Sequence, residues 1–183
     1  ERFPMHSLLH DPASLQTRIQ QVTGERLLAD LVFPEHIDGI RNASAVMFLL
    51  GLLPDENGGA PEPSLILNKR SQAVNQPGDL CCPGGGISPG MDTFLARTMV
   101  FPGLPMWRWP FWSTIRSRRF KEAEILRILF FTCLREGFEE MRLNPFGVRF
   151  LGPLPVQRLV MFGRVIYPMV GWVSKQQRFR LNW

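Results

Sequence analysis

The residues best suited to chemistry form an acidic cluster in the last third of the chain, Arg135-Glu136-Gly137-Phe138-Glu139-Glu140. On a helix, Glu136 would lie three residues before Glu139 and four before Glu140, so the carboxylates would project from roughly one side. Like charges at this spacing repel, and Arg135 can offset only one of them. A divalent cation would neutralise the excess, and carboxylate oxygens suit the hard ions Mg²⁺ and Mn²⁺. The alternative is a solvated acidic face.

A glycine run far upstream is the second candidate. Pro83-Gly84-Gly85-Gly86 follows a short apolar segment at 79–82. This order predicts a strand that ends in a loop, whose backbone bends sharply or comes close to a ligand. A glycine loop alone is weak evidence for a binding site.

Two basic residues, Lys69 and Arg70, follow an apolar run that is expected to be a strand. Their side chains supply hydrogen-bond donors that suit phosphate oxygens. A solvated strand end is the alternative. The sequence leaves both interpretations open.

Together these segments resemble the signature of the Nudix hydrolase family. Its pattern opens with a glycine and closes with Arg-Glu-hydrophobic-x-Glu-Glu. Gly85 matches the opening glycine, and the closing half matches Arg135, Glu136, Glu139, Glu140 and Leu143. Upstream, 65–71 and 78–85 resemble the extended motif of the coenzyme A pyrophosphatase branch. The resemblance covers about residues 45–173.

The resemblance implies an α/β fold, a Nudix-type α/β/α sandwich with a mixed sheet. It implies metal-dependent hydrolysis of the diphosphate in coenzyme A, an acyl-coenzyme A or a related nucleoside diphosphate derivative. Mg²⁺ or Mn²⁺ would be held by Glu136, Glu139, Glu140 and the Gly85 carbonyl, and Arg135 would orient the carboxylates. The implied substrate contacts are Lys69, Arg70, Gly84 and Gly85.

Two alternatives stay open. One is a Nudix hydrolase of a nucleotide sugar or a dinucleotide. The other is a non-catalytic binding module of the same fold that uses an aromatic and basic insertion against a membrane surface or a protein.

The chain departs from the family pattern within the motif itself. About fifty residues separate Gly85 from Arg135, so an insertion at about 89–119 splits the motif. The nearest match to the acidic residue of the first half is Asp92, which is in register only if Gly86 opens the motif. The sequence ends at Trp183, before elements that family members usually have, so we expect a C-terminally truncated fold.

The insertion concentrates aromatic residues between prolines at 101–112, and Arg116, Arg118 and Arg119 follow. This proline density excludes a long regular helix across 101–110. A satellite hydrophobic cluster on the main domain is one interpretation. A lid over the substrate, or a surface for a membrane or a partner, is the other.

Composition favours one domain, residues 1–183, and a phosphorylated small molecule as partner. The formal charge of +5 favours polyanions. Nucleic acid is the weaker choice, because there is a single tyrosine and no arginine-rich tract. A homodimer is left open.

The three cysteines, Cys81, Cys82 and Cys133, lack zinc-ligand spacing and are expected to be buried free thiols in a reducing compartment. With no signal-like start and no long apolar run, a cytoplasmic location is expected. No catalytic role is predicted for Ser71 or Cys133, nor for any histidine (His6, His10 and His36).

Periodicity predicts the main elements. Residues 11–32 suggest one or two short helices, interrupted near Gly24. Apolar runs at 45–50 and 64–68 predict two strands of a hairpin. A long helix is expected over 120–143, carrying the acidic cluster on its final turns, and strands over 148–154 and 165–173.

Overall fold

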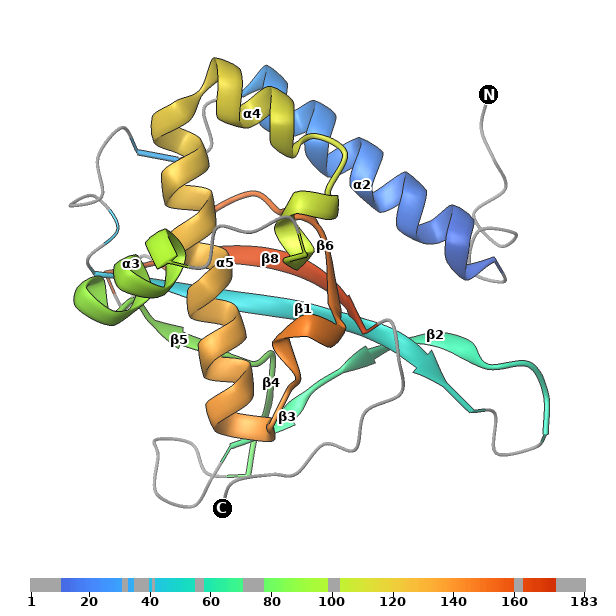
Figure 1. Cartoon of the computed structure of the whole chain (residues 1–183). Coiled ribbons are helices and arrows are strands. Elements are labelled where there is room, and N and C mark those ends of the chain that lie inside the picture. Colours follow the sequence, from blue (N-terminus) through green and yellow to red (C-terminus); the bar gives the residue numbers. More distant parts are fainter. Residues whose placement is uncertain are drawn as a thin grey trace.

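The computed structural model describes residues 11–30, 33–34, 40, 42–54, 58–70, 78–98, 103–159 and 163–173. The three histidines and Ser71 lie outside these ranges. The described residues form a mixed sheet with helices against it, which confirms the predicted α/β class (Figure 1).

The sheet is built around the long strand β1 (Ala43–Leu53). Strand β8 (Arg164–Val173) runs parallel to β1, and the other pairings are antiparallel. The main order is β2-β1-β8-β6, with β2 at Glu62–Ile66 and β6 at Val148–Pro153. Two short strands join at one end, β5 (Gly84–Gly86) on β1 and β7 (Gln157–Leu159) on β8. A separate pair is β3 (Asn68–Lys69) with β4 (Leu80–Cys81).

The predicted hairpin is confirmed, because β1 and β2 pair antiparallel with Leu50 opposite Leu65. One face of β1 carries fully buried apolar side chains, as the alternation of a strand with one face on the core requires. These are Ala43, Ala45, Met47 and Leu49.

Helix α5 (Phe120–Met141) crosses the sheet and contacts this buried face (Figure 1). It matches the predicted helix to within two residues. Its core side buries Leu126, Leu129 and Phe130 completely. The helix ends where Arg142 adopts a left-handed backbone with φ of 57° and the Leu143 amide donates to the Gly137 carbonyl at 3.1 Å.

Helix α2 (Pro12–Ala29) is continuous, so the predicted interruption near Gly24 is wrong. Gly24 is required by packing and does not break the helix. A Cβ there would lie only 2.2 Å from the Phe111 ring. Leu15 and Ile19 of α2 pack on a second cluster containing Trp172, while Leu27 joins the main core.

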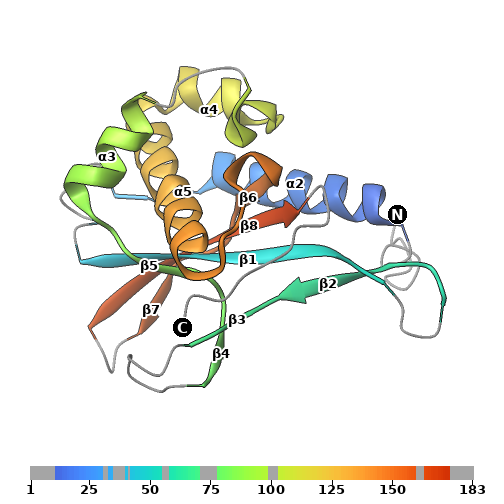
Figure 2. The same ribbon diagram turned by 60° about the horizontal axis from the view of Figure 1, so that its bottom comes forward.

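The insertion forms α3 (Pro89–Thr98), the single turn η2 (Pro105–Arg108) and α4 (Trp112–Arg118). Figure 2 shows α3 and α4 on the same side of the sheet as α5. No long helix crosses 103–110, as the prolines predict. Trp109, Trp112 and Ile115 are buried in the main core. The insertion therefore packs on the main domain as expected, but the prediction of a separate satellite cluster is wrong, because these side chains belong to the same core as those of β1 and α5.

None of the helices within the described ranges carries an apolar stretch long enough to cross a membrane.

Candidate functional site

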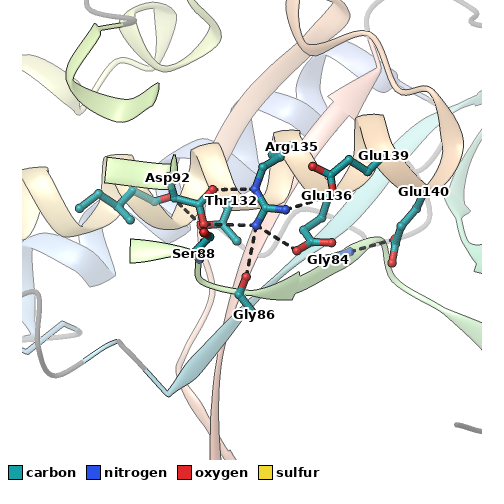
Figure 3. Close-up of polar contacts among 10 residues, drawn as sticks. Gly84, Gly86, Ser88, Asp92, Thr132, Arg135, Glu136, Glu139 and Glu140 are labelled. Carbon is teal, nitrogen blue, oxygen red and sulfur yellow. Dashed lines mark hydrogen bonds and ion pairs between the residues drawn. The ribbon is translucent and has the colours of Figure 1, made fainter. Parts of the chain in front are cut away.

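Arg135 is the centre of the site's polar contacts (Figure 3). Its guanidinium donates to both oxygens of Asp92, at 2.7 Å and 3.3 Å, and to the Gly86 carbonyl at 3.3 Å. It also pairs with Glu136 at 3.0 Å and with Glu139 at 3.2 Å. Arg135 thus ties α3, β5 and the acidic turns of α5 together.

Asp92 is completely buried on α3. Besides Arg135, it accepts hydrogen bonds from the Ser88 amide at 2.7 Å and the Thr132 hydroxyl at 2.9 Å. The Ser88 contact caps the start of α3. These donors compensate the burial of the charge, so Asp92 fixes the position of Arg135 and is shielded from ligands. Asp92 therefore lies beside Arg135, although the two residues are 43 positions apart in the sequence.

Glu136 and Glu140 point toward the glycine strand β5 (Figure 3). The Glu136 carboxyl occupies the space above Gly85, where an added Cβ would stand 2.5 Å from it. Glu140 Oε2 accepts from the Gly84 amide at 3.3 Å and from Asn68 Nδ2 at 3.1 Å. Two of the three predicted carboxylates thus share one side of α5 and one neighbouring strand.

Glu139 is placed differently. Its side chain is 52% exposed and pairs with Arg135. To join the other two carboxylates around one ion, it would have to leave this pairing.

The glycine run is part of the sheet, so the predicted loop at this position is wrong. Gly84, Gly85 and Gly86 form β5, with Ala45 of β1 opposite Gly85. Gly84 has φ of +150°, and a Cβ there would lie 2.3 Å from the Ala45 carbonyl oxygen. Glycine is needed because the strand is squeezed between β1 and α5.

Burial raises the pKa of both Glu136 and Glu140 above the ordinary value of 4.5. For Glu140 the Glu136 charge adds to this shift, while the Gly84 and Asn68 hydrogen bonds and the Arg70 charge oppose it. For Glu136 the Arg135 charge opposes the shift. Hydrogen bonding to Asp92 is the largest cause that raises the pKa of Arg135, which stays charged. For both carboxylates burial is the largest cause, and the neighbouring donors and positive charges offset it only in part.

The predicted phosphate contacts lie beside this pair of carboxylates. Arg70 follows β3, and its amide donates to the Asp79 carbonyl at 2.9 Å. Its charge acts on Glu140, which places the two side chains in one neighbourhood. Lys69 is exposed on β3, opposite Leu80.

Two residues that contribute side-chain hydrogen bonds to the site, Asn68 and Thr132, were not predicted. Thr132 carried a signal, because a polar residue interrupts an otherwise apolar stretch of α5. Asn68 had none, since a polar residue beside Lys69 is ordinary at a strand end.

The cysteines are partly as predicted. Cys133 is buried and free, but Cys81 and Cys82 are only partly buried. Burial raises the pKa of Cys133 well above its ordinary value, which keeps the thiol protonated.

Neither a protein-family model nor a curated protein matches this chain. The resemblance to Nudix hydrolases thus rests on its motif residues alone, and it stays a prediction.

The donor set fits a divalent cation in part. Among the residues that the structure describes, no three His, Cys, Asp or Glu side chains come close enough together to hold a metal ion. Glu136 and Glu140 are nevertheless partly buried and repel each other. A cation bound by two carboxylates and neutral oxygens is consistent with these residues.

Proposed function

We propose that this chain is a divalent-cation-dependent hydrolase of a phosphoanhydride bond, with coenzyme A or an acyl-coenzyme A as the favoured substrate. The observation that carries the proposal is the pair Glu136 and Glu140, held half-buried against β5 with pKa values raised by burial. The substrate class rests on the resemblance of residues 65–71 and 78–85 to the coenzyme A branch.

Burying acidic side chains costs free energy, and the Arg135 pair with Glu136 and the two hydrogen bonds to Glu140 offset that cost only in part, since the pKa of both carboxyls stays raised. A partly buried pair of this kind is a candidate functional site. Glu136 and Glu140 would hold the cation, which would neutralise diphosphate charge and lower the pKa of a coordinated water. Glu139 joins this set in the proposal if it leaves Arg135. The Gly85 carbonyl is a further proposed oxygen ligand.

The remaining residues act by position and charge. Arg135 holds the start of the acidic turn in place through Asp92. Arg70 and Lys69 would attract the diphosphate, and Arg70 already acts on Glu140. Gly84 and Gly85 are proposed substrate contacts through their backbone. The lack of side chains there lets the Glu136 and Glu140 carboxyls come close to β5. Water would add to one phosphorus of coenzyme A as the bridging bond breaks, releasing phosphopantetheine and adenosine 3′,5′-bisphosphate.

The binding-module alternative draws less support from the insertion than its composition suggested. Trp109 and Trp112 are buried in the core and are not available to a membrane. Trp107 is partly buried, with the Arg116 guanidinium 4.8 Å from its ring centre. A homodimer stays a prediction. The free thiols are the reason to keep a cytoplasmic location within this proposal.

The test is a substrate panel in Mg²⁺ or Mn²⁺ that contains coenzyme A, an acyl-coenzyme A, a nucleotide sugar and a dinucleotide. We expect cleavage of the first two to exceed that of the others and to disappear in Glu140→Gln. Preferred cleavage of a nucleotide sugar or a dinucleotide would keep the reaction and replace the substrate. Metal-independent cleavage would overturn the proposed chemistry.

A further inference from the structure

Asn68 makes the only side-chain hydrogen bond, within the described residues, that reaches Glu140 from outside α5 and β5. Its Nδ2 donates to Glu140 Oε2 at 3.1 Å, across 72 residues of sequence. The reverse amide orientation would set Oδ1 against a carboxylate oxygen, so this hydrogen bond fixes which amide atom faces Glu140.

The other polar atom of the Asn68 amide, Oδ1, makes no such hydrogen bond within the part of the chain that the structure describes. Asn68 is 5% exposed, and its Oδ1 is buried without a hydrogen-bond partner among the described residues. Leaving a buried acceptor unpaired costs the free energy of its desolvation. Few buried polar groups in native proteins are left in this state, so the oxygen calls for a partner.

The surroundings of this oxygen indicate what the partner is. Glu140 Oε2 is 3.1 Å from Nδ2 of the same amide group, and Glu136 projects from α5 toward the same strand as Glu140 (Figure 3). An amide carbonyl beside two carboxylates is the oxygen set that Mg²⁺ and Mn²⁺ accept. Glu139, the third predicted carboxylate, is 52% exposed and pairs with Arg135.

The backbone holds Asn68 in place. Strand β3 pairs with β4, with Asn68 opposite Cys81. Two residues further on, Arg70 donates its amide to the Asp79 carbonyl at 2.9 Å, and its carbonyl accepts from the Gly78 amide at 3.1 Å. A ligand fixed before the ion binds loses less conformational entropy on binding.

We propose that Asn68 completes the cation site, with Oδ1 as a neutral oxygen ligand and Nδ2 holding Glu140 in its binding orientation. This inference rests on the proposed function, since it concerns the same cation. It goes beyond the motif resemblance, in which Asn68 has no assigned role. The site then consists of Glu136, Glu140 and Asn68.

Calorimetric titration with Mn²⁺ tests the proposal without relying on turnover. We compare wild type with Asn68→Leu, Asn68→Asp and Glu140→Gln, and we check each fold by thermal unfolding without metal. Asn68→Leu keeps the size and removes both polar atoms, so we expect Mn²⁺ affinity to fall by about 10- to 100-fold. Asn68→Asp keeps an oxygen at the same position, so it should bind Mn²⁺ at least as tightly as wild type.

Salt separates direct ligation from long-range charge. The affinity of Asn68→Asp should persist at high salt, because a distant added charge is screened and a direct ligand is not. If Asn68 only orients Glu140, Asn68→Asp loses the donor and binds as weakly as Asn68→Leu. That result overturns the ligand assignment.

The remaining outcomes separate this inference from the proposed function. Wild-type affinity in Asn68→Leu, with weak binding in Glu140→Gln, would overturn the role of Asn68 and keep the carboxylate site. Absence of Mn²⁺ binding to the wild-type chain would overturn both.

Discussion

The Arg135 guanidinium donates hydrogen bonds to both carboxylate oxygens of Asp92, a residue that lies 43 positions earlier on a different helix. This pairing connects α3, at the start of the predicted insertion, to the acidic turns of α5, although the two are far apart in the sequence. The insertion contributes a structural acid to the site, because α3 packs against α5.

Replacing Asp92 with alanine should destabilise the protein by about 3–5 kcal/mol, because it leaves a partly buried arginine without its main partner. The Ser88 amide and the Thr132 hydroxyl also lose their acceptor. Urea unfolding measures the loss. The control is Arg97→Ala, which removes a pair with Glu124 whose arginine is 63% exposed, and it should cost under about 1 kcal/mol. Equal losses in the two variants would contradict the role of Asp92.

Gly24→Ala should destabilise the protein, although alanine normally favours a helix. The added Cβ would meet the Phe111 ring at 2.2 Å, and that ring is itself packed against Trp109. We expect a loss of about 1–3 kcal/mol from overpacking. Gly90→Ala is the matched control, because nothing lies within 4 Å of its added Cβ. It should be neutral or up to about 1 kcal/mol more stable.

A gain in stability for Gly24→Ala would show that α2 does not pack on the insertion as described. Thermal unfolding of both variants distinguishes the two results.

Gly85→Ala should leave the fold intact and weaken Mn²⁺ binding. Its Cβ would lie 2.5 Å from the Glu136 carboxyl, which is the end of a flexible side chain and is able to move away. Gly86→Ala is the control, since its added Cβ meets nothing within 4 Å. Calorimetric titration should show weaker binding only for Gly85→Ala. Equal affinity in both variants would mean that Glu136 does not contribute to the site where it stands.

Glu140→Gln should make the metal-free protein more stable at neutral pH. Burial raises the pKa of Glu140 above 4.5, so the folded state holds the proton more tightly than the unfolded state. The stability associated with this group is present below 4.5 and is lost as pH rises through the folded-state pKa. The amide avoids that loss, so the advantage of the variant should grow from about pH 4 to about pH 7.

Urea unfolding in a chelator checks this pH dependence. Glu25→Gln, on the exposed side of α2, is the control for the same chemical change at a surface position. A Glu140→Gln protein that is less stable than wild type at neutral pH would contradict the burial of an uncompensated charge.

The elements with strong periodicity were predictable from sequence. The length of α5 follows from its repeated apolar side and from the proline after Asn144, and the β1–β2 hairpin follows from two apolar runs joined by a glycine- and proline-rich loop. Periodicity carries no information about what a face touches. For this reason Gly24 was predicted to interrupt the helix, whereas the close approach of the Phe111 ring explains why a glycine stands there.

The candidate site was predictable in its residue types and less so in its arrangement. The spacing of Glu136 and Glu140 places both on one side of a helix, as found (Figure 3). The same spacing placed Glu139 with them, but its side chain is 52% exposed, whereas Glu136 and Glu140 lie against β5. The burial of Asp92 and the contact of Asn68 with Glu140 depend on tertiary packing, which a single sequence does not express.

The central claim is that Glu136 and Glu140 bind the cation that supports phosphoanhydride hydrolysis. The most direct test is the initial rate of coenzyme A cleavage against Mn²⁺ concentration, for wild type, the Glu136→Gln/Glu140→Gln double variant and the Glu25→Gln control. We predict a saturable dependence on Mn²⁺ in wild type and the control, and a loss of at least about 100-fold in the double variant. A folded double variant that retains the wild-type rate at every Mn²⁺ concentration would contradict the account.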